Sequence, residues 1–162
     1  MYLNLDAIDA KILFYLQKNA KMPIKEMSEY IHLSESAIHA RIRNLEERGC
    51  IKNYVAVLNK SMVNKKLTSF TGLQLRTHTQ YNLITSMELI SKFPEVINCY
   101  MVNGDFDFLL HVAVADMQEY HSFFSNALLK VKNIETVKTF FVLDESKADN
   151  RIDLSRRSRM RH

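Results

Sequence analysis

The stretch from Leu33 to Arg48 constrains the fold of this chain most, because it reads as a helix with a signal at each end. Ser34 is a good N-cap residue, since its hydroxyl can accept a hydrogen bond from a free backbone N–H in the first turn. Gly49 follows the last residue of the apolar period and favours the end of a helix there. We therefore predict one bounded helix across this stretch.

The predicted helix has two unlike faces. Three branched apolar residues recur at helical spacing and form a narrow stripe that faces a core: Ile38, Ile42 and Leu45. The opposite side carries short or hydrogen-bonding side chains and one arginine: Ser36, His39, Ala40, Arg43 and Glu47. Such a face can approach base edges closely in a DNA groove, where arginine can bridge a guanine edge or a phosphate. An ordinary solvated helix face would show the same pattern.

The segment before this helix favours the DNA-binding alternative. Pro23–Ile31 begins with proline at a first-turn position and has apolar residues spaced three and four apart, so it predicts a short amphipathic helix. Only His32 and Leu33 lie between it and Ser34, which requires a steep crossing of the two helices, as in a helix-turn-helix. His32 is expected to occupy the turn, since histidine tolerates positive φ better than β-branched residues do.

Length and composition limit the classes of protein that the chain can belong to. The 162 residues suffice for one medium domain or two small ones, and 47% hydrophobic and 25% charged residues are typical of a globular protein. No apolar run approaches the ~20 residues that span a bilayer, and the N-terminus lacks a secretory pattern, so we expect a cytoplasmic protein. Cys50 and Cys99 and the six histidines lack metal-ligand spacing. We predict no metal and no cofactor.

The distribution of charge suggests a separate nucleic-acid-binding portion. Residues 1–60 hold nine Lys and Arg against seven Asp and Glu, residues 61–145 hold seven against nine, and residues 146–162 hold six against two. The three contributions are +2, −2 and +4 to a net charge of +4. A basic first part and tail suit a partner with phosphates. The tail, with Arg151, Arg156, Arg157, Arg159 and Arg161, could reach DNA, or it could be disordered or a solubilising end.

The first third of the chain reads as a small helical unit. Asp6 is expected to cap a first helix, which gives a three-helix unit over residues 6–48. The β-branched residues of 51–58 predict a strand after it. We assign residues 1–58 to this DNA-binding domain and residues 59–66, which are polar and basic, to a linker.

Strand-like and helical segments alternate in the second part. Strands are predicted at 67–76, 96–102, 106–114 and 137–143, with helices at 82–93 and after Asp116. The order strand, helix, strand, strand, helix, strand is that of a ferredoxin-like fold, so the chain is expected to be α+β. Residues 67–145 form this domain and residues 146–162 a basic tail.

Two expectations about side chains follow from this fold. Alternation in the strand 106–114 places Phe106, Phe108, Leu110, Val112 and Val114 on one face. Two helices would cover one side of the sheet, and the other side would be left bare. We expect the bare side to carry apolar residues drawn from Leu73, Leu75, Ile97, Cys99, Met101 and Leu109. Such a face invites pairing with a second copy, so at least a homodimer is predicted.

Four motifs in this order resemble the Lrp/AsnC family, the feast/famine transcriptional regulators. They are Leu5 to Leu13, Leu33 to Glu46, Gly49 to Tyr54, and Val102 to Phe108. The resemblance, over roughly residues 3–145, implies a winged helix-turn-helix, a C-terminal ligand-sensing αβ sandwich, and dimers that often assemble into tetramers or octamers. Departures from the family are Val63 to Lys66, where a linker glycine is common, and the tail.

The resemblance also implies an effector site, for small molecules that are usually amino acids, near a Gly-x-x-Asp turn. Carried onto this chain, the turn comprises Asn103, Gly104, Asp105, Phe106 and Asp107. Backbone amides at such a turn can hold a carboxylate while an Asp pairs with an ammonium group. The alternative is that the glycine and Asp105 merely form a hairpin turn.

The leading hypothesis is a sequence-specific, double-stranded-DNA-binding regulator that responds to such an effector. Base readout is assigned to Ser36, His39, Ala40 and Arg43, and phosphate contact to Ser34, Arg41 and Lys52. A symmetric dimer predicts a palindromic operator. One alternative keeps the DNA-binding domain and makes the second domain an assembly module without ligand. Another is an enzyme that uses Asp105 and Asp107, with His111 nearby, but no nucleophile, phosphate loop or metal cluster accompanies them.

Overall fold

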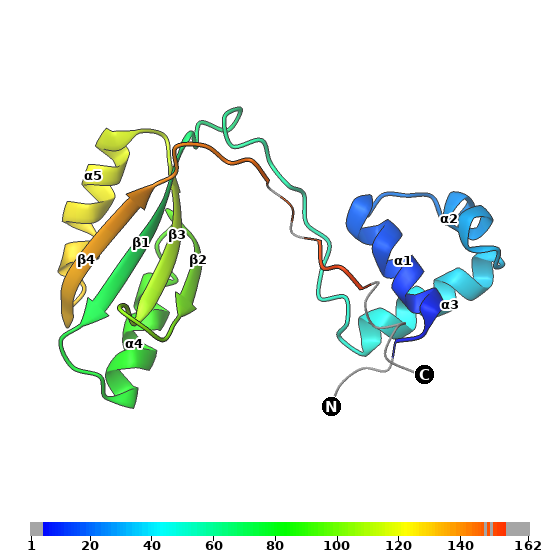
Figure 1. Cartoon of the computed structure of the whole chain (residues 1–162), viewed down its shortest axis with the longest axis horizontal. Coiled ribbons are helices and arrows are strands. Elements are labelled where there is room, and N and C mark those ends of the chain that lie inside the picture. Colours follow the sequence, from blue (N-terminus) through cyan, green and yellow to red (C-terminus); the bar gives the residue numbers. More distant parts are fainter. Residues whose placement is uncertain (1–4, 148, 150, 155–162) are drawn as a thin grey trace. The chain divides into compact units, whose positions relative to one another are not determined.

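The chain folds into two compact units in the computed structural model, which describes residues 5–147, 149 and 151–154. One unit comprises the residues up to Ala56 together with the C-terminal segment from Lys147, and the other comprises Val57–Ser146 (Figure 1). Each unit has its own apolar core. Four of the tail arginines singled out in the sequence, at 156, 157, 159 and 161, lie outside the described residues.

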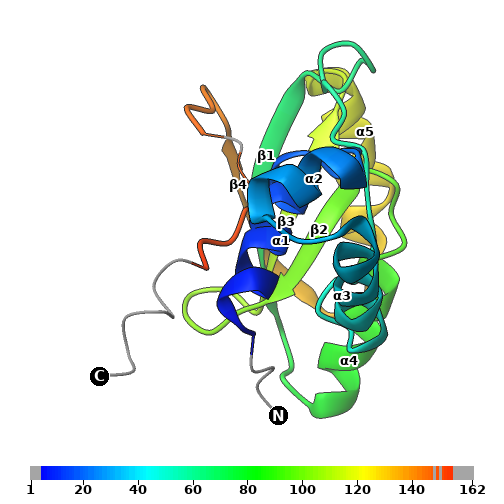
Figure 2. The same cartoon turned by 90° about the vertical axis from the view of Figure 1, so that its right-hand side faces the viewer.

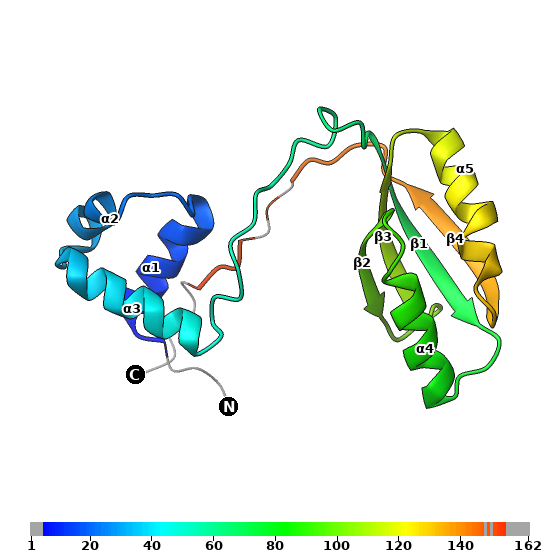
Figure 3. The same cartoon turned by 180° about the vertical axis from the view of Figure 1, so that it is seen from behind.

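The N-terminal unit is built from three helices, as the sequence predicts: α1 (Ala7–Lys18), α2 (Ile24–Ile31) and α3 (Glu35–Glu47) (Figure 3). Their apolar stripes meet in one core of Ile12, Leu13, Leu16, Met27, Ile31, Ile38 and Leu45. The third helix therefore rests on the first two and keeps its opposite side toward solvent.

Local signals fix the ends of these helices. Asp6 and Asp9 form a reciprocal capping box at α1, in which each carboxylate accepts a hydrogen bond from the backbone N–H of the other residue. Ser34 accepts a hydrogen bond from the N–H of Ala37 at 3.3 Å and caps α3. His32 adopts φ 60° and ψ 46° between α2 and α3, so the predicted left-handed turn is confirmed.

The strand predicted at 51–58 is wrong. These residues have no strand neighbour among the described residues and run as an extended segment. Tyr54, Val55, Val57 and Leu58 are between 48% and 84% exposed. A β-branched composition favours extended backbone, but a strand also needs a partner for its N–H and C=O groups.

The second unit is a four-stranded antiparallel sheet with two helices and one 3-10 turn. Its elements are β1 (Leu67–Leu75), α4 (Gln80–Ile90), β2 (Val96–Met101), β3 (Phe108–Val114), α5 (Met117–Asn126), η1 (Leu128–Lys130) and β4 (Ile134–Phe141). The strand order is β2-β3-β1-β4, so the βαββαβ ferredoxin-like order is confirmed. Both α4 and α5 lie on one side of the sheet (Figure 2).

The prediction of the bare side of the sheet was partly wrong. Leu73, Leu75 and Cys99 pack into the core beneath the helices, because the odd-numbered residues of β1 point that way. The alternate positions, which face away from the helices, carry Phe70, Tyr100, Leu109, His111 and Phe140. We call these five residues the open sheet face. Phe70, Tyr100 and Phe140 are between 39% and 56% exposed.

Several element ends also differ from the prediction. The helix expected at 82–93 spans Gln80–Ile90, because Thr79 supplies the N-cap through a bond from Asn82 N–H and the helix ends before the segment that precedes Pro94. The strand expected at 137–143 begins at Ile134, since residues from there on pair with β1. The strand expected at 106–114 begins only at Phe108.

Candidate DNA-binding surface and effector turn

The outer face of α3 is open to solvent. Four residues assigned to base readout are exposed on it: Ser36, His39, Ala40 and Arg43. Their exposure follows from the burial of Ile38 and Leu45 on the other side of the helix. At the N-terminal end, the hydroxyls of Ser34 and Ser36 lie 3.1 Å apart and share a hydrogen bond.

A shallow hollow of about 300 Å³ adjoins this face. Its lining combines apolar side chains with donors from α3, and includes Leu16, Met22, Ile24, His39, Ile42 and Arg43. Tyr54 closes one side, and its hydroxyl donates to the carboxylate of Glu46 at 2.8 Å. Partial burial and this carboxylate together raise the pKa of Tyr54 to about 12. The segment after Gly49 is thereby tied back to α3 without a strand.

Arg41 is placed differently from the other polar residues of α3. Its Nη1 lies 2.7 Å from a carboxylate oxygen of Asp6 and 2.7 Å from one of Asp9, so α3 is joined to the start of α1. Asp9 is only 13% exposed. The hydrogen bond from the Asp9 N–H, and then Arg41, lower the pKa of Asp6. Hydrogen bonds to the two carboxylates raise the pKa of Arg41, which therefore has an internal partner that the sequence did not predict.

The turn that carries the predicted effector residues joins β2 to β3. Asn103, Gly104 and Asp105 are exposed. Gly104 has φ 130°, a conformation that residues with a Cβ rarely adopt, so glycine is required here. Among residues 5–147, 149 and 151–154, no atom lies within 4 Å of a Cβ added at Gly104, apart from its own chain neighbours.

Asp107 is held by β1. One oxygen of its carboxylate accepts the backbone N–H of Leu75 at 2.7 Å and lies 3.0 Å from Nε2 of His78. Its backbone N–H donates to the carbonyl of Leu73 at 2.8 Å. Because the Asp107 side chain is only 17% exposed and already carries these partners, it pins the end of β1 to the start of β3.

Phe106 lies across β1 on the open side of the sheet. A Cβ added to Gly72 would meet its ring at 2.6 Å, and the ammonium of Lys138 lies 5.9 Å from the ring centroid. Phe106 is therefore not on the same face as Phe108, contrary to the expected alternation. The reason is that the strand starts only after Asp107, so the alternation does not extend back to residue 106.

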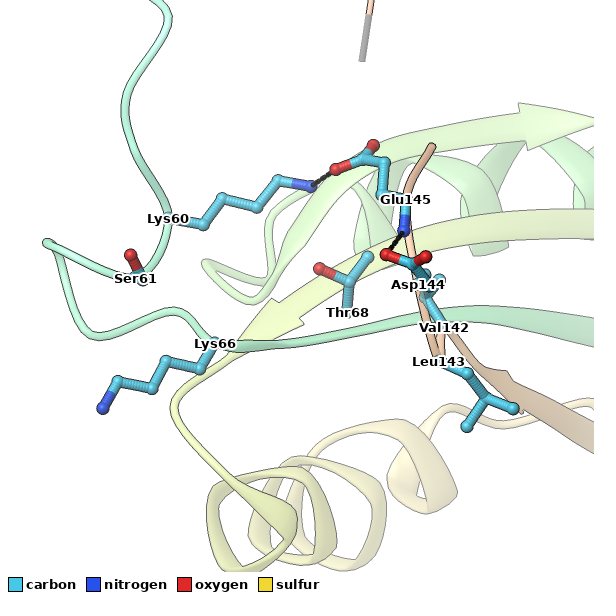
Figure 4. A pocket seen from close by; sticks show the side chains of 8 residues that line it. All are labelled: Lys60, Ser61, Lys66, Thr68, Val142, Leu143, Asp144 and Glu145. Carbon is cyan, nitrogen blue, oxygen red and sulfur yellow. Dashed lines mark hydrogen bonds and ion pairs between the residues drawn. The ribbon is translucent and has the colours of Figure 1, made fainter. Parts of the chain in front are cut away.

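A second hollow, of about 420 Å³, lies where β1 and β4 meet the preceding segment (Figure 4). Lys60 reaches Glu145 at 3.5 Å across it, while the side chain of Lys66 points away from both (Figure 4). None of the predicted site residues lines this hollow. Within residues 5–147, 149 and 151–154, no group of three or more His, Cys, Asp or Glu could hold a metal, and no helix is long and apolar enough to cross a membrane.

Each of the two units matches a known protein family model. Residues 5–52 match the winged helix-turn-helix DNA-binding family, and residues 68–152 match the Lrp/AsnC ligand binding domain. The chain belongs to the Lrp/AsnC family. The leucine-responsive regulatory protein of Escherichia coli is 32% identical over 154 residues, which cover 95% of this chain and 94% of that protein.

Solved structures of Lrp/AsnC regulators agree over nearly the whole chain. The AsnC family regulator of Agrobacterium tumefaciens has a TM-score of 0.89 and 32% identity, with 94% of this chain and 99% of that one covered. A Neisseria meningitidis regulator crystallised with L-Met has a TM-score of 0.87 and 31% identity, with the same coverage. This chain is thus a DNA-binding Lrp/AsnC transcriptional regulator, and its relatives are regulators, not enzymes.

The sequence predicted some features of the two candidate sites, whereas other side-chain partners are seen only in the structure. The sequence predicted the exposed face of α3 and the Gly104 turn, which the structure keeps open. It did not predict His78 and the Leu75 amide as partners of Asp107, or Asp6 and Asp9 as partners of Arg41. No local signal marks these pairs, because each joins residues about 30 positions apart.

Proposed function

We propose that this Lrp/AsnC regulator reads duplex DNA with the outer face of α3 and changes its assembly or DNA affinity when an amino acid binds near the Gly104 turn. The exposure of Ser36, His39, Ala40 and Arg43 on one face of α3 is the observation that carries the first half. A face with one arginine and small neighbours suits direct contact with base edges in the major groove.

Phosphate contact is assigned to Ser34, Arg41 and Lys52. Lys52 is exposed and follows α3 closely, so it is the foremost candidate of the three. Arg41 and Ser34 already serve the fold, as the partner of Asp9 and as the N-cap of α3. Their phosphate contacts would therefore be additional to these roles and smaller in effect.

The proposed effector is an amino acid. The Neisseria relative with L-Met bound supports the chemical class, and the match to a ligand binding domain supports the part of the chain. The candidate site comprises Asn103, Gly104, Asp105, Phe106 and Asp107. Exposed backbone at Gly104 can offer an N–H to a carboxylate, and Asp105 can pair with an ammonium group. Asp107, already bonded to Leu75, is better suited to hold the turn in place.

Assembly through the open sheet face completes the proposal. Its aromatic side chains form an apolar surface of the kind that mediates association, and a homodimer that can build tetramers or octamers would place two DNA-binding domains on a palindromic operator. A chain that acts on the genome in this way is assigned to the cytoplasm.

Two measurements test the proposal. Selection of bound sites from random duplexes should give a palindrome whose half-sites lie about one helical turn, or a multiple of it, apart. Thermal shift of the full chain is measured against a panel of amino acids, and at least one of them should raise the melting temperature. A ligand at 100 times its Kd adds about 2.7 kcal/mol to the free energy of unfolding. A chain that selects DNA but responds to no amino acid would favour the alternative, an assembly module without ligand.

A further inference from the structure

A group of exposed aromatic side chains lies on the DNA-binding unit, outside α3. Phe14 and Tyr15 of α1 meet edge to face with ring centroids 5.4 Å apart, and Tyr15 stacks on Tyr30 of α2 with centroids 5.3 Å apart. We call these three residues the aromatic patch. Phe14 is 53% exposed and Tyr30 is 54% exposed, so two of the three rings remain largely in solvent although the rings contact one another.

The aromatic patch faces away from the core of its unit. The residues that α1 buries are Ile12, Leu13 and Leu16. At about 100° per residue, Phe14 lies on the opposite side of the helix from these three. On one flank of Phe14, Gln17 is bonded to the C-terminal segment, since the N–H of Ile152 donates to its Oε1 at 2.7 Å. The other flank leads through Tyr15 to α2.

Opposite charges border the aromatic patch on its two sides. On α1, Lys11 and Lys18 lie one turn before and one turn after the phenylalanine, on the same side of the helix. On α2, Glu26 lies one turn before the tyrosine and Glu29 next to it. All four are exposed, and within residues 5–147, 149 and 151–154 no ion pair involves any of them. We call the two lysines the lysine edge and the two glutamates the glutamate edge.

This arrangement is complementary to itself. A two-fold axis places the same surface of two copies face to face. If α1 of one copy lies against α2 of the other, the rings meet in the middle and the lysine edge meets the glutamate edge twice. The alternative two-fold contact, α1 against α1, would bring like charges together. Charge complementarity therefore favours a second copy of this chain in the first arrangement.

The aromatic patch is too small to hold two free copies together. A fully covered aromatic side chain buries about 150–250 Å², so three partly exposed rings offer roughly 300 Å² per copy. Stable interfaces bury about 800 Å² per partner. The contact therefore requires two copies that are already held close, because a shared support raises their effective concentration. Copies bound side by side on one duplex meet this condition.

We propose that the aromatic patch is a contact between the DNA-binding units of two copies of this regulator that occupy neighbouring stretches of one duplex. This inference rests on the proposed DNA-binding function. The patch lies on α1 and α2, so the side chains of α3 that are assigned to base readout take no part in the contact. Neighbouring copies on the duplex thereby stabilise each other's binding.

The first experiment maps the contact by photo-cross-linking of the full chain. Phe14→benzoylphenylalanine is made in isotope-labelled and in unlabelled protein, and the two are mixed in equal amounts on a long random-sequence duplex at low salt. After irradiation and digestion, mass spectrometry identifies mixed cross-links, which join a labelled copy to an unlabelled one. We expect them to join residue 14 to α2 of the second copy. Mixed cross-links to other parts of the chain only, or none at all, would overturn the inference.

A charge swap tests whether the partner is a second copy. Two variants reverse one edge each: Lys11→Glu with Lys18→Glu, and Glu26→Lys with Glu29→Lys. At equal occupancy of the duplex, each should lower the yield of mixed cross-links at least about fivefold, because like charges then face each other. All four substitutions together should restore the yield, since the edges are again opposite in charge. A combined variant no better than the lysine-edge variant would point to an acidic segment of another protein and overturn the inference.

A matched control moves the cross-linking group within the same unit. Lys25→benzoylphenylalanine places it on α2, five residues from Tyr30 and therefore on another side of that helix. It should give only a background of mixed cross-links. A yield equal to that from residue 14 would indicate random encounters on the DNA, which also overturns the inference. A wild-type chain that binds no duplex would refute the proposed function itself, whereas missing cross-links in a chain that binds duplex would overturn this inference alone.

Discussion

The guanidinium of Arg41 lies 2.7 Å from the carboxylate of Asp9 and joins α3 to α1 in the N-terminal unit. The pair is partly shielded, since the arginine is 32% exposed and the aspartate 13%. The orientation of α3 on α1 therefore depends on a charged contact as well as on the apolar core.

Replacement of Arg41 should cost stability. Arg41→Ala leaves Asp9 without its cation, and we expect the free energy of unfolding to fall by about 1 kcal/mol, after allowance for solvent screening. Arg43→Ala, on the exposed side of the same helix, should change it by less than about 0.5 kcal/mol. Chemical denaturation followed by helical circular dichroism measures both. Equal effects would contradict the structural role of Arg41.

Arg43 and Lys52 should affect DNA binding in different ways. Arg43→Ala should relax base preference, because its guanidinium is assigned to base edges, while Lys52→Ala should weaken binding to all sequences and lower the salt slope by about 1. Filter binding on a selected site and on a scrambled duplex separates the two effects. If neither variant weakens binding, the assigned roles are wrong.

Substitutions of Asp107 and Asp105 should affect different properties: the first should lower the stability of the fold, and the second should abolish the response to an amino acid. Asp107→Ala leaves the buried N–H of Leu75 without its acceptor, which should cost about 1–3 kcal/mol of stability in thermal or chemical unfolding. Asp105 is exposed, so Asp105→Ala should leave stability nearly unchanged and instead abolish the thermal shift caused by an amino acid. A stable Asp107→Ala protein would refute the pinning role.

Gly72 should tolerate a methyl group only if Phe106 is removed. In Gly72→Ala the new Cβ would collide with the ring, so we expect stability to fall by about 1–3 kcal/mol. In a Phe106→Ala background the same substitution should be close to neutral. A double-mutant cycle of unfolding free energies measures the coupling, and additive effects would contradict the proximity of the two residues.

Acid should weaken the sheet domain through His111. Its ring stacks on Phe70 with centroids 5.1 Å apart, and its Nδ1 lies 3.2 Å from Oδ1 of Asn98. Burial, and then Lys60, lower the pKa of His111, against the opposing effect of Glu145. The unfolded chain therefore takes up the proton first, and stability should fall as the pH drops from about 6.5 through the lowered pKa. His111→Gln should remove this step in a pH series of unfolding curves.

The sequence by itself determined the elements that depend on local chemistry. Ser34, Asp6 and Asp116 mark helix starts because an N-cap bond needs only neighbours in the chain, and the pattern of apolar residues predicted the order of strands and helices. The exposed face of α3 follows from the same periodicity. These features could be predicted without any knowledge of distant contacts.

Only the tertiary structure decided which surfaces and partners these elements have. Leu73 and Phe70 point to opposite faces of β1. Leu73 is in the core and Phe70 is on the surface because the helices pack on the face that carries Leu73. Residues 51–58 have no strand neighbour in the part of the chain that the structure describes, and Arg41, Asp107 and Ile152 have partners far along the chain. Such pairings depend on distances that the chain acquires only when it folds.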